Sequence, residues 1–298
     1  MTKQSLLLFS KVSVDAGMAH PQELIDGINA SGEDVVAHHA LLENMVFYIA
    51  GEETDVIDAP TGTSLRTYDN VYFRYWGKAR SPAMTGARFC DAKGIPYLDR
   101  EVLRRGAYDK MTQYMQLWAA NVAVPKSLIG LPPHLVSYFE HYGFTFPCIM
   151  KATEGTRGKH NYLIRDMKQL QALADDVSTI PFVLQEFIPN DGDYRVWVVG
   201  GEVVAIIGRK ATEGSHLNNT SQGGDAEWLE LDALPEFVKD MCIRGAAFLD
   251  RDIAGVDIVQ SKTDGAYYCF EVNRSPQVEF TPYADKKAAF VARLLATL

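Results

Sequence analysis

The sequence predicts a protein of the α/β class, with α+β character in its later part, divided into three lobes. Short strand and helix signals alternate through the first hundred residues. An amphipathic helix begins a second region near residue 109, and a glycine-centred β-hairpin marks a third. A length of 298 residues exceeds that of a typical domain. We therefore expect lobes at residues 1–108, 109–187 and 188–298.

The first lobe is predicted to be a small α/β unit. Strands are expected at residues 6–9 and 71–74, and helices at residues 21–30 and 83–93. Pro21 suits the first turn of a helix, and Gly94 suits a position just beyond a helix end. Ile95 then begins another extended segment.

The second lobe is predicted to begin with a helix that ends before Pro125 and has Asp109 as its N-cap. Its apolar face is expected to comprise Met111, Tyr114, Met115 and Trp118, which have helical spacing. Strands at residues 146–151, 162–164 and 182–186 and a helix at 167–174 are expected to complete the lobe.

The third lobe is predicted to open with a β-hairpin, residues 194–199 and 202–207, whose turn is Gly200-Gly201. A helical stripe of apolar residues follows, consisting of Val238, Met241, Cys242, Gly245, Phe248 and Leu249. Two further strands are expected at residues 255–260 and 266–273.

Composition excludes several classes of protein. The four cysteines form no CxxC pair, which disfavours zinc ribbons and thioredoxin-like chemistry. A net charge of −9 without a basic tract argues against a nucleic-acid partner. The apolar run at residues 6–9 is far shorter than the roughly 20 residues that span a bilayer, and it lacks the flanks of a secretory signal. We expect no membrane partner and a cytoplasmic location.

Acidic and amide side chains on the last two strands give the sharpest chemical signal. Strand alternation places Glu271 and Asn273 on one face and Phe270 and Val272 on the other, and Asp257 on the preceding strand can face the first pair. These oxygen ligands suit Mg²⁺. The alternative is a solvent-facing sheet surface, although Asp and Asn are depleted in strands.

Two features resemble phosphate-binding elements. Lys151 ends a strand, and a loop containing Glu154, Gly155 and Gly158 follows; its backbone amides could surround phosphate oxygens. The loop is no Walker A motif, and a plain β-turn is the alternative. Lys110 opposes the helix dipole at the start of its helix, although a solvated lysine remains an alternative.

Taken in order, these segments resemble the ATP-grasp superfamily, in particular its RimK-like branch of glutamate and amino-acid ligases. The resemblance rests on Asp109-Lys110, FPCIMK at 146–151, Glu154-Gly155 with Gly158, VLQEFI at 183–188, Asp193-Tyr194-Arg195, residues 198–205, Gly223-Gly224, GVDI at 255–258 and EVNRSP at 271–276. It implies an ATP-grasp fold preceded by a Rossmann-like pre-ATP-grasp domain.

The resemblance also implies which residues bind ATP and metal. Lys110 and Lys151 would contact phosphates, and residues 154–158 would form a lid over them. Adenine would meet a hinge of Gln185, Glu186, Phe187 and Ile188, and Asp193 would meet ribose or support its neighbours. Asp257, Glu271 and Asn273 would hold two Mg²⁺ ions, with Mn²⁺ as a substitute.

Other residues are implied to serve catalysis and substrate binding. Arg195, Arg209 and Lys210 would stabilise the transferring phosphoryl group, although flanking surface charges are an alternative. Arg74, Ser275 and Asn219 would lie at the substrate site, with Asn218 an alternative register for Asn219. The aromatic cluster Tyr72, Phe73, Tyr75 and Trp76 could line that site, but core packing is favoured.

The implied reaction joins a carboxylate to an amine through an acyl phosphate, with ATP cleaved to ADP. The expected substrate is an amino acid, a peptide or a protein tail, and a homo-oligomer is compatible with the sequence. The alternatives are an ATP-grasp phosphotransferase acting on a small molecule and a nucleotide-binding module without catalysis. In the sequence, Gln277 replaces the family's usual glycine after Ser275-Pro276, which leaves acceptor specificity open.

Overall fold

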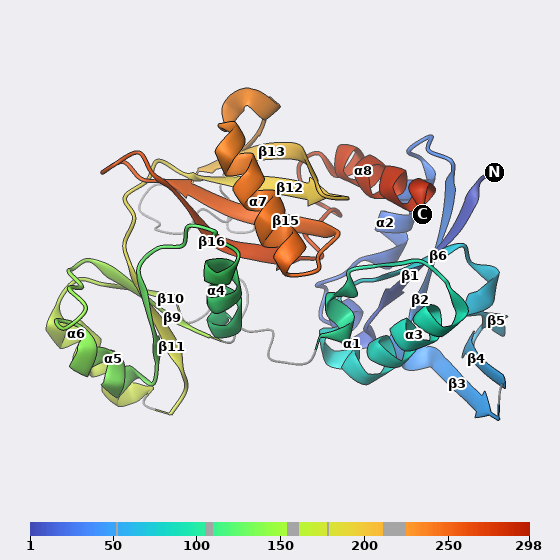
Figure 1. Ribbon diagram of the computed structural model, residues 1–298, viewed down its shortest axis with the longest axis horizontal. Coiled ribbons are helices and arrows are strands. Elements are labelled where there is room, and N and C mark those ends of the chain that lie inside the picture. Colours follow the sequence, from blue (N-terminus) through green and yellow to red (C-terminus); the bar gives the residue numbers. More distant parts are fainter. Residues whose placement is uncertain (52, 105–109, 154–160, 178, 211–224) are drawn as a thin grey trace.

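The computed structural model describes residues 1–51, 53–104, 110–153, 161–177, 179–210 and 225–298. Its elements form three groups, each built on its own main sheet (Figure 1). The predicted α/β class is confirmed. Within the described ranges, no helix is long and apolar enough to cross a membrane.

The N-terminal group is a parallel sheet with strand order β2-β1-β6-β7. Its elements are β1 (Lys3–Phe9), α1 (Lys11–Asp15), α2 (Pro21–Asn29), β2 (Val35–Leu41), β6 (Asn70–Phe73), α3 (Arg80–Lys93) and β7 (Tyr97–Leu98). The run Leu6 to Phe9 is buried throughout, as is typical of a parallel strand covered on both faces. Gly94 has φ +67° and ends α3, as predicted.

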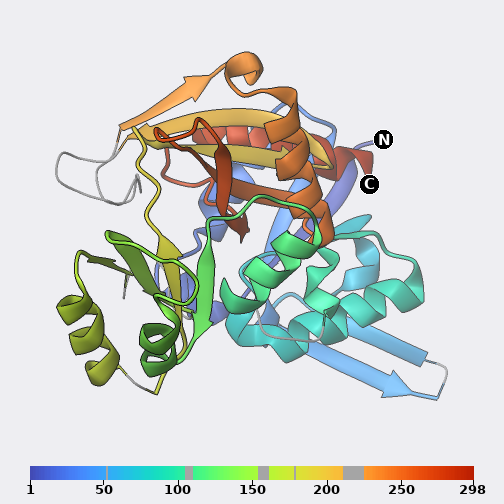
Figure 2. The same cartoon turned by 60° about the vertical axis from the view of Figure 1, so that its left-hand side comes forward.

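A small antiparallel sheet is inserted between β2 and β6, where the sequence analysis placed no strand. It consists of β3 (Met45–Ala50), β4 (Glu53–Asp58) and β5 (Thr63–Ser64). This sheet extends away from the rest of the molecule in both cartoon views (Figures 1 and 2).

The central group is an antiparallel sheet with strand order β10-β9-β11-β8. Its elements are α4 (Lys110–Ala119), β8 (Ser127–Gly130), α5 (Pro132–Tyr138), β9 (Cys148–Ala152), β10 (Asn161–Ile164), α6 (Met167–Asp176) and β11 (Phe182–Glu186). The predicted strands at 146–151, 162–164 and 182–186 and the predicted helix at 167–174 are confirmed. Their ends differ by no more than two residues, and β11 has the predicted bounds.

The predicted apolar face of α4 was partly wrong. Tyr114 and Leu117 are its buried residues, whereas Met115 and Trp118 are 60% and 68% exposed. The helix packs against α7 and β16 through Tyr114 and Leu117, so the tertiary contact, not hydrophobicity alone, selects its inner face. The predicted N-cap Asp109 lies outside the described residues.

The C-terminal group is an antiparallel sheet with strand order β14-β13-β12-β15-β16. Its elements are β12 (Asp193–Val199), β13 (Glu202–Lys210), β14 (Asp225–Leu229), α7 (Glu236–Phe248), β15 (Ile253–Gln260), β16 (Tyr267–Arg274) and α8 (Ala284–Thr297). Gly200 and Gly201 have φ +60° and +84°, which matches the predicted hairpin turn. Helix α7 covers one face of the sheet (Figure 1).

Helix α8 returns to the N-terminal sheet and packs against α2, β1 and β2. One buried core contains Leu7 and Ile28 from the first group together with Trp197 and Val291 from the last. The two termini lie side by side in both views, and Lys3 Nζ donates a hydrogen bond to the carbonyl of Leu298 at 2.8 Å (Figures 1 and 2). The first and last parts of the chain are therefore joined by a common core.

Candidate active site

The centre of the site is the buried carboxylate of Asp257 on β15. Arg195 on β12 donates to Oδ1 from Nε at 2.5 Å and to Oδ2 from Nη2 at 3.1 Å. Arg209 on β13 donates to Oδ1 at 2.9 Å and holds both oxygens of Asp193 at 2.6 Å. Three adjacent strands thus carry one ion-pair network, because antiparallel pairing brings their side chains onto the same face.

Gly255 makes room for this network. A Cβ at this position would lie 2.9 Å from Pro276 Cβ and 3.0 Å from Cδ and Nη1 of Arg195. Real Cβ atoms do not approach neighbours that closely, so glycine lets the arginine side chain lie flat across β15 and reach Asp257.

The arginines control the ionisation of Asp257. Burial alone would raise the pKa of this carboxyl, but the charges of Arg195 and Arg209 and the hydrogen bonds hold it below its usual value. Asp257 is therefore a carboxylate at neutral pH.

Asp257, Glu271 and Asn273 are brought together as the sequence predicts. Glu271 is the cross-strand partner of Asp257, and Asn273 Nδ2 donates to Asp257 Oδ2 at 3.1 Å. Among the described residues, none donates a hydrogen bond to the Glu271 carboxylate or to Asn273 Oδ1. Two carboxylates and one amide oxygen are hard ligands that suit Mg²⁺. Within the described ranges, no group of three or more His, Cys, Asp or Glu could hold a metal, so an ion here would also need ligands from water or phosphate.

The predicted alternation of β16 was wrong at Phe270. The pairing of β15 with β16 shifts register after Asp257, and Cys269 and Val272 both face the core. The Phe270 ring instead lies 5.7 Å from the ammonium of Lys151. A β-bulge explains this orientation, because one extra residue resets which face each side chain occupies.

A second buried network centres on Lys151 of β9. Its ammonium donates to Tyr114 Oη at 2.7 Å and to Gln185 Oε1 at 2.9 Å. Tyr114 in turn donates to the carbonyl of Phe270 at 3.0 Å, which connects the central and C-terminal sheets. Burial lowers the pKa of Lys151 to about 8, with the negative charge of Glu271 opposing the shift.

Some of the other predicted nucleotide-binding residues lie near the Lys151 network, and the rest lie outside the residues that the structure describes. Glu186 ends β11 and accepts a hydrogen bond from the Lys126 amide at 2.6 Å, and Ile188 is buried. Phe187 lies between them. The Lys110 amide donates to the Thr153 carbonyl at 3.2 Å. Glu154, Gly155, Gly158, Asn218 and Asn219 lie outside the described residues.

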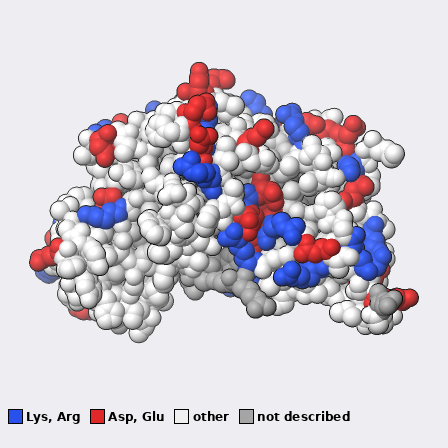
Figure 3. All heavy atoms as spheres, viewed as in Figure 1, with Lys and Arg blue, Asp and Glu red and all other residues white. Residues whose placement is uncertain are grey.

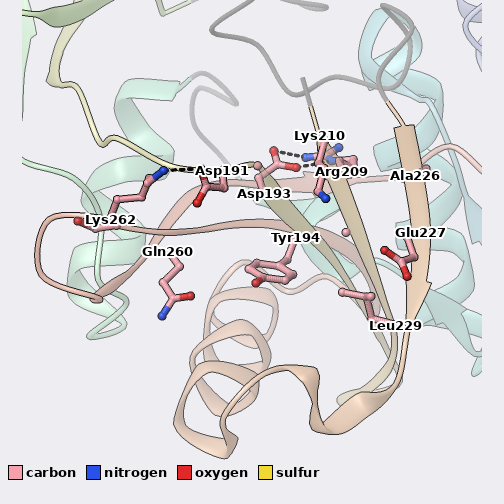
Figure 4. A pocket seen from close by; sticks show the side chains of 13 residues that line it. Asp191, Asp193, Tyr194, Arg209, Lys210, Ala226, Glu227, Leu229, Gln260 and Lys262 are labelled. Carbon is pink, nitrogen blue, oxygen red and sulfur yellow. Dashed lines mark hydrogen bonds and ion pairs between the residues drawn. The ribbon is translucent and has the colours of Figure 1, made fainter. Parts of the chain in front are cut away.

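Asp193 and Arg209 also line a cavity of about 500 Å³ at one end of β12 and β13 (Figure 4). Lys210, the third predicted catalytic residue, lines it too, as do Tyr194, Glu227 and Lys262. Figure 4 shows the Asp193–Arg209 pair at one side of this space. This pair therefore connects the ion-pair network to the cavity.

The predicted substrate residues Arg74 and Ser275 are buried. Arg74 is 0% exposed, and its Nη2 donates to the carbonyl of Pro276 at 3.0 Å and to Glu279 Oε2 at 3.4 Å. Ser275 Oγ accepts a hydrogen bond from the Tyr75 amide at 3.4 Å. Both residues thus hold the segment after β16 against the end of β6. The favoured core packing is confirmed for three members of the aromatic cluster, Tyr72, Phe73 and Trp76.

Two members of these networks were not recognised as site residues from the sequence. Tyr114 was assigned to an apolar helix face, and its spacing gave no sign that its hydroxyl joins Lys151 to Gln185. Glu279 was not among the predicted site residues, although it is the carboxylate partner of Arg74.

The fold and site define a class of protein. The central antiparallel sheet contributes the Lys151 network, and the C-terminal antiparallel sheet contributes the Asp257 network. A domain with a parallel sheet precedes both. This arrangement is that of an ATP-grasp enzyme.

Known proteins agree with this class. The model of the RimK-like ATP-grasp domain family matches residues 107–294. A probable alpha-L-glutamate ligase of Mannheimia succiniciproducens is 31% identical over 220 residues, covering 72% of this chain and 71% of that protein. Its counterpart in Pasteurella multocida is 29% identical over 223 residues, covering 72% and 68%.

Solved structures agree over nearly the whole chain. A RiPP-associated ATP-grasp ligase of Chryseobacterium gregarium, in complex with ADP and a leader and core peptide, has a TM-score of 0.71 at 13% identity, covering 99% of this chain and 97% of that one. The ATP-grasp ligase PsnB, complexed with a phosphomimetic variant of its minimal precursor, Mg and ADP, has a TM-score of 0.68 at 20% identity, covering 99% of each chain.

This chain belongs to the RimK-like ATP-grasp family. The predicted ATP-grasp fold and the predicted class of ATP-dependent ligase are confirmed.

Proposed function

We propose that the protein forms an amide bond between a carboxylate and an amine through an acyl phosphate, with ATP cleaved to ADP and phosphate. The observation that carries this proposal is the pairing of a buried lysine on one sheet with a buried Asp257 network on the next. The first substrate to test is L-glutamate, because the curated relatives are named as glutamate ligases. Peptides come second, because several proteins of the same fold were solved with precursor peptides.

The nucleotide is proposed to bind between the central and C-terminal sheets. Lys151 would act as a point charge on phosphate oxygens, with its position fixed by Tyr114 and Gln185. Lys110 would do the same from the start of α4. Glu186, Phe187 and Ile188 would meet adenine, whereas Gln185 is engaged with the lysine. Glu154, Gly155 and Gly158 remain predicted lid residues.

Magnesium is proposed to be held by Asp257, Glu271 and Asn273, and the number of ions is proposed to be two, with Mn²⁺ as a substitute. When bound, the metal would neutralise phosphate charge and polarise the transferring group. The side-chain oxygens of these three residues are hard ligands on one sheet face. Arg195 and Arg209 keep Asp257 ionised.

Arg195, Arg209 and Lys210 are proposed to stabilise the phosphoryl group as negative charge develops on it. Asp193 is proposed to position Arg209 rather than to bind ribose, because both of its oxygens accept hydrogen bonds from that arginine. Arg74 and Ser275 are proposed to act at the substrate side through residues 275–279, which both hold in place. Asn219 remains a predicted substrate residue.

The two boundaries between the three lobes, after residues 108 and 187, also remain proposals, as do a cytoplasmic location and homo-oligomer formation. A cytoplasmic location would supply the ATP that the proposed reaction needs, and size-exclusion chromatography with light scattering would test the oligomer.

The test is incubation of the protein with ATP, Mg²⁺ and L-glutamate or peptides, with and without an amine. We expect ADP and phosphate release that depends on the acid and an amide product in mass spectrometry. Hydroxylamine should trap the acyl phosphate as a hydroxamate. AMP and pyrophosphate would contradict the acyl-phosphate route, and a stable phosphorylated product without an amide would indicate a phosphotransferase.

A further inference from the structure

A lysine on the C-terminal helix is buried, and no acidic side chain among the described residues pairs with it. Lys287 lies in the first turn of α8 and is 5% exposed. Its Nζ donates to Thr281 Oγ1 at 2.9 Å and lies 5.6 Å from the centroid of the Trp197 ring. Within the described part of the chain, no carboxylate forms an ion pair with it. Lysine is almost never buried this deeply unless it is paired.

The surroundings of Lys287 are positive rather than negative. Burial, together with the smaller effect of the nearby charges of Arg195 and Arg209, lowers its pKa to about 8. Those two arginines are bound to Asp257 and Asp193, so three cations face two carboxylates. The negative charge of Glu271 acts instead on Lys151 and Tyr114, on the nucleotide side. The Lys287 end of the network therefore carries surplus positive charge.

Packing alone does not explain a lysine at this position. Its neighbours on α8, Ala288 and Val291, belong to the apolar core shared with Trp197. An unbranched apolar side chain would fill the same space without the cost of burying an ammonium. A buried charged group that costs stability in this way is retained where it binds a ligand.

We propose that Lys287, beside Arg195, binds an oxyanion of the acid substrate, either its carboxylate or the phosphoryl group transferred to it. The ligand would supply the negative charge that the described residues lack and would hydrogen-bond the remaining donors of the ammonium. This inference rests on the proposed function, which it deepens by naming a further residue that binds the acid substrate.

Steady-state kinetics with L-glutamate, or with a peptide if glutamate is inactive, give the first test. In Lys287→Met, KM for the acid should rise roughly ten- to a hundredfold, the loss expected for one charge-assisted hydrogen bond. KM for ATP should change less than about twofold. Lys287→Arg should recover part of the loss. The matched control is Lys286→Met, since Lys286 is the adjacent, exposed lysine on α8.

A binding measurement separates this inference from the proposed function. With Mg²⁺ and a nonhydrolysable ATP analogue saturating the nucleotide site, acetate and inorganic phosphate are titrated at constant ionic strength, and the unfolding temperature is followed. The wild type and Lys286→Met should be stabilised by one of these anions, and Lys287→Met should lose most of that shift. Acetate as the effective anion indicates the carboxylate, and phosphate indicates the phosphoryl group.

The outcomes are distinguishable. If no acid supports turnover, the proposed function fails, while the anion titration still tests Lys287. An unchanged shift and an unchanged KM in Lys287→Met would overturn the inference, as would the absence of any anion effect on the wild type. Lys287→Met should be at least as stable as the wild type without anion, and a large loss of stability would assign the lysine a structural role instead.

Discussion

Arg195 and Asp257 lie directly opposite one another on β12 and β15, and the guanidinium binds both carboxylate oxygens. The carboxylate that the sequence marks as a metal ligand is thus neutralised by arginines in the protein itself. Glu271, its partner on the other side, has no such donors among the described residues. The two acidic residues therefore differ in what they contribute to folding.

The first prediction concerns Asp257→Asn. Removing one member of a buried ion-pair network leaves Arg195 and Arg209 with less compensation. We expect the free energy of unfolding to fall by about 3 kcal/mol, measured by denaturant titration, together with loss of ligase activity. The exposed Asp264→Asn serves as the control. Wild-type stability in Asp257→Asn would mean that the network does not stabilise the fold.

The second prediction concerns Glu271→Gln. Because no described residue donates to this carboxylate, the free energy of unfolding should stay within about 0.5 kcal/mol of the wild type. Activity should nevertheless fall by more than about a hundredfold, because a metal ligand acts on the transferring phosphoryl group. The measurement is ADP release against Mg²⁺ concentration. Full activity would exclude Glu271 from the metal site.

The third prediction concerns Tyr114→Phe. The hydroxyl accepts hydrogen bonds from Lys151 and Gln185 and donates to Phe270, so its loss leaves buried groups unpaired. We expect the free energy of unfolding to fall by about 1–3 kcal/mol. The pKa of Lys151 should fall below about 8, since an acceptor for its charged form is removed. KM for ATP should therefore rise, most strongly above neutral pH, whereas the exposed Tyr138→Phe should leave it unchanged.

Local signals in the sequence predict much of this fold. The bounds of β11 follow from its β-rich composition, and the glycine pair at 200–201 correctly places a hairpin turn, because these features depend on neighbouring residues alone. The outward orientation of Met115 and Trp118 depends on where α4 packs, which no local pattern contains. The bulge at Phe270 is likewise decided by the pairing of two strands.

The contacts of the site, too, were predicted where the partners are close in the sequence and not where they are distant. Alternation on β16 places Glu271 and Asn273 near Asp257 because the two strands are adjacent in the chain. Partners distant in sequence were not predicted. Arg195 and Asp257 are separated by 62 residues, and Arg74 and Glu279 by 205. Their pairing follows from the sheet order and from the way the N-terminal and C-terminal groups pack.

The fourth prediction concerns the buried pair of Arg74 and Glu279. Glu279→Gln should lower the free energy of unfolding by about 3 kcal/mol, because it leaves Arg74 charged inside the core. The double variant Arg74→Met with Glu279→Leu should recover most of that loss, since apolar residues of similar volume replace buried ion pairs well. Recovered ligase activity in the double variant supports a positioning role for Arg74. A stable but inactive double variant would indicate direct substrate contact.

Asp99 joins the end of β7 to the start of β15. Its Oδ1 accepts hydrogen bonds from the amides of Asp252 and Ile253 at 2.8 and 3.2 Å, and its own amide donates to Asp252 Oδ2 at 2.6 Å. Burial raises the pKa of Asp99 to about 7, and the negative charge of Asp252 adds to the shift. This contact between the N-terminal and C-terminal groups therefore responds to pH.

The fifth prediction follows from the sign of that shift. Between roughly pH 4 and pH 7 the folded protein holds a proton on Asp99 that the unfolded chain has released, so unfolding releases a proton. The contribution of Asp99 to stability must then fall as the pH rises through this window, by at most about 4 kcal/mol for three pKa units, and stay constant above it. Asp99→Asn keeps an amide oxygen as acceptor but cannot titrate. The difference in free energy of unfolding between the wild type and Asp99→Asn, measured from pH 5 to 8, should therefore turn against the wild type as the pH rises. A difference that does not change with pH would show that Asp99 is already ionised at pH 5, and would mean that the contacts with Asp252 and Ile253 outweigh the cost of burial.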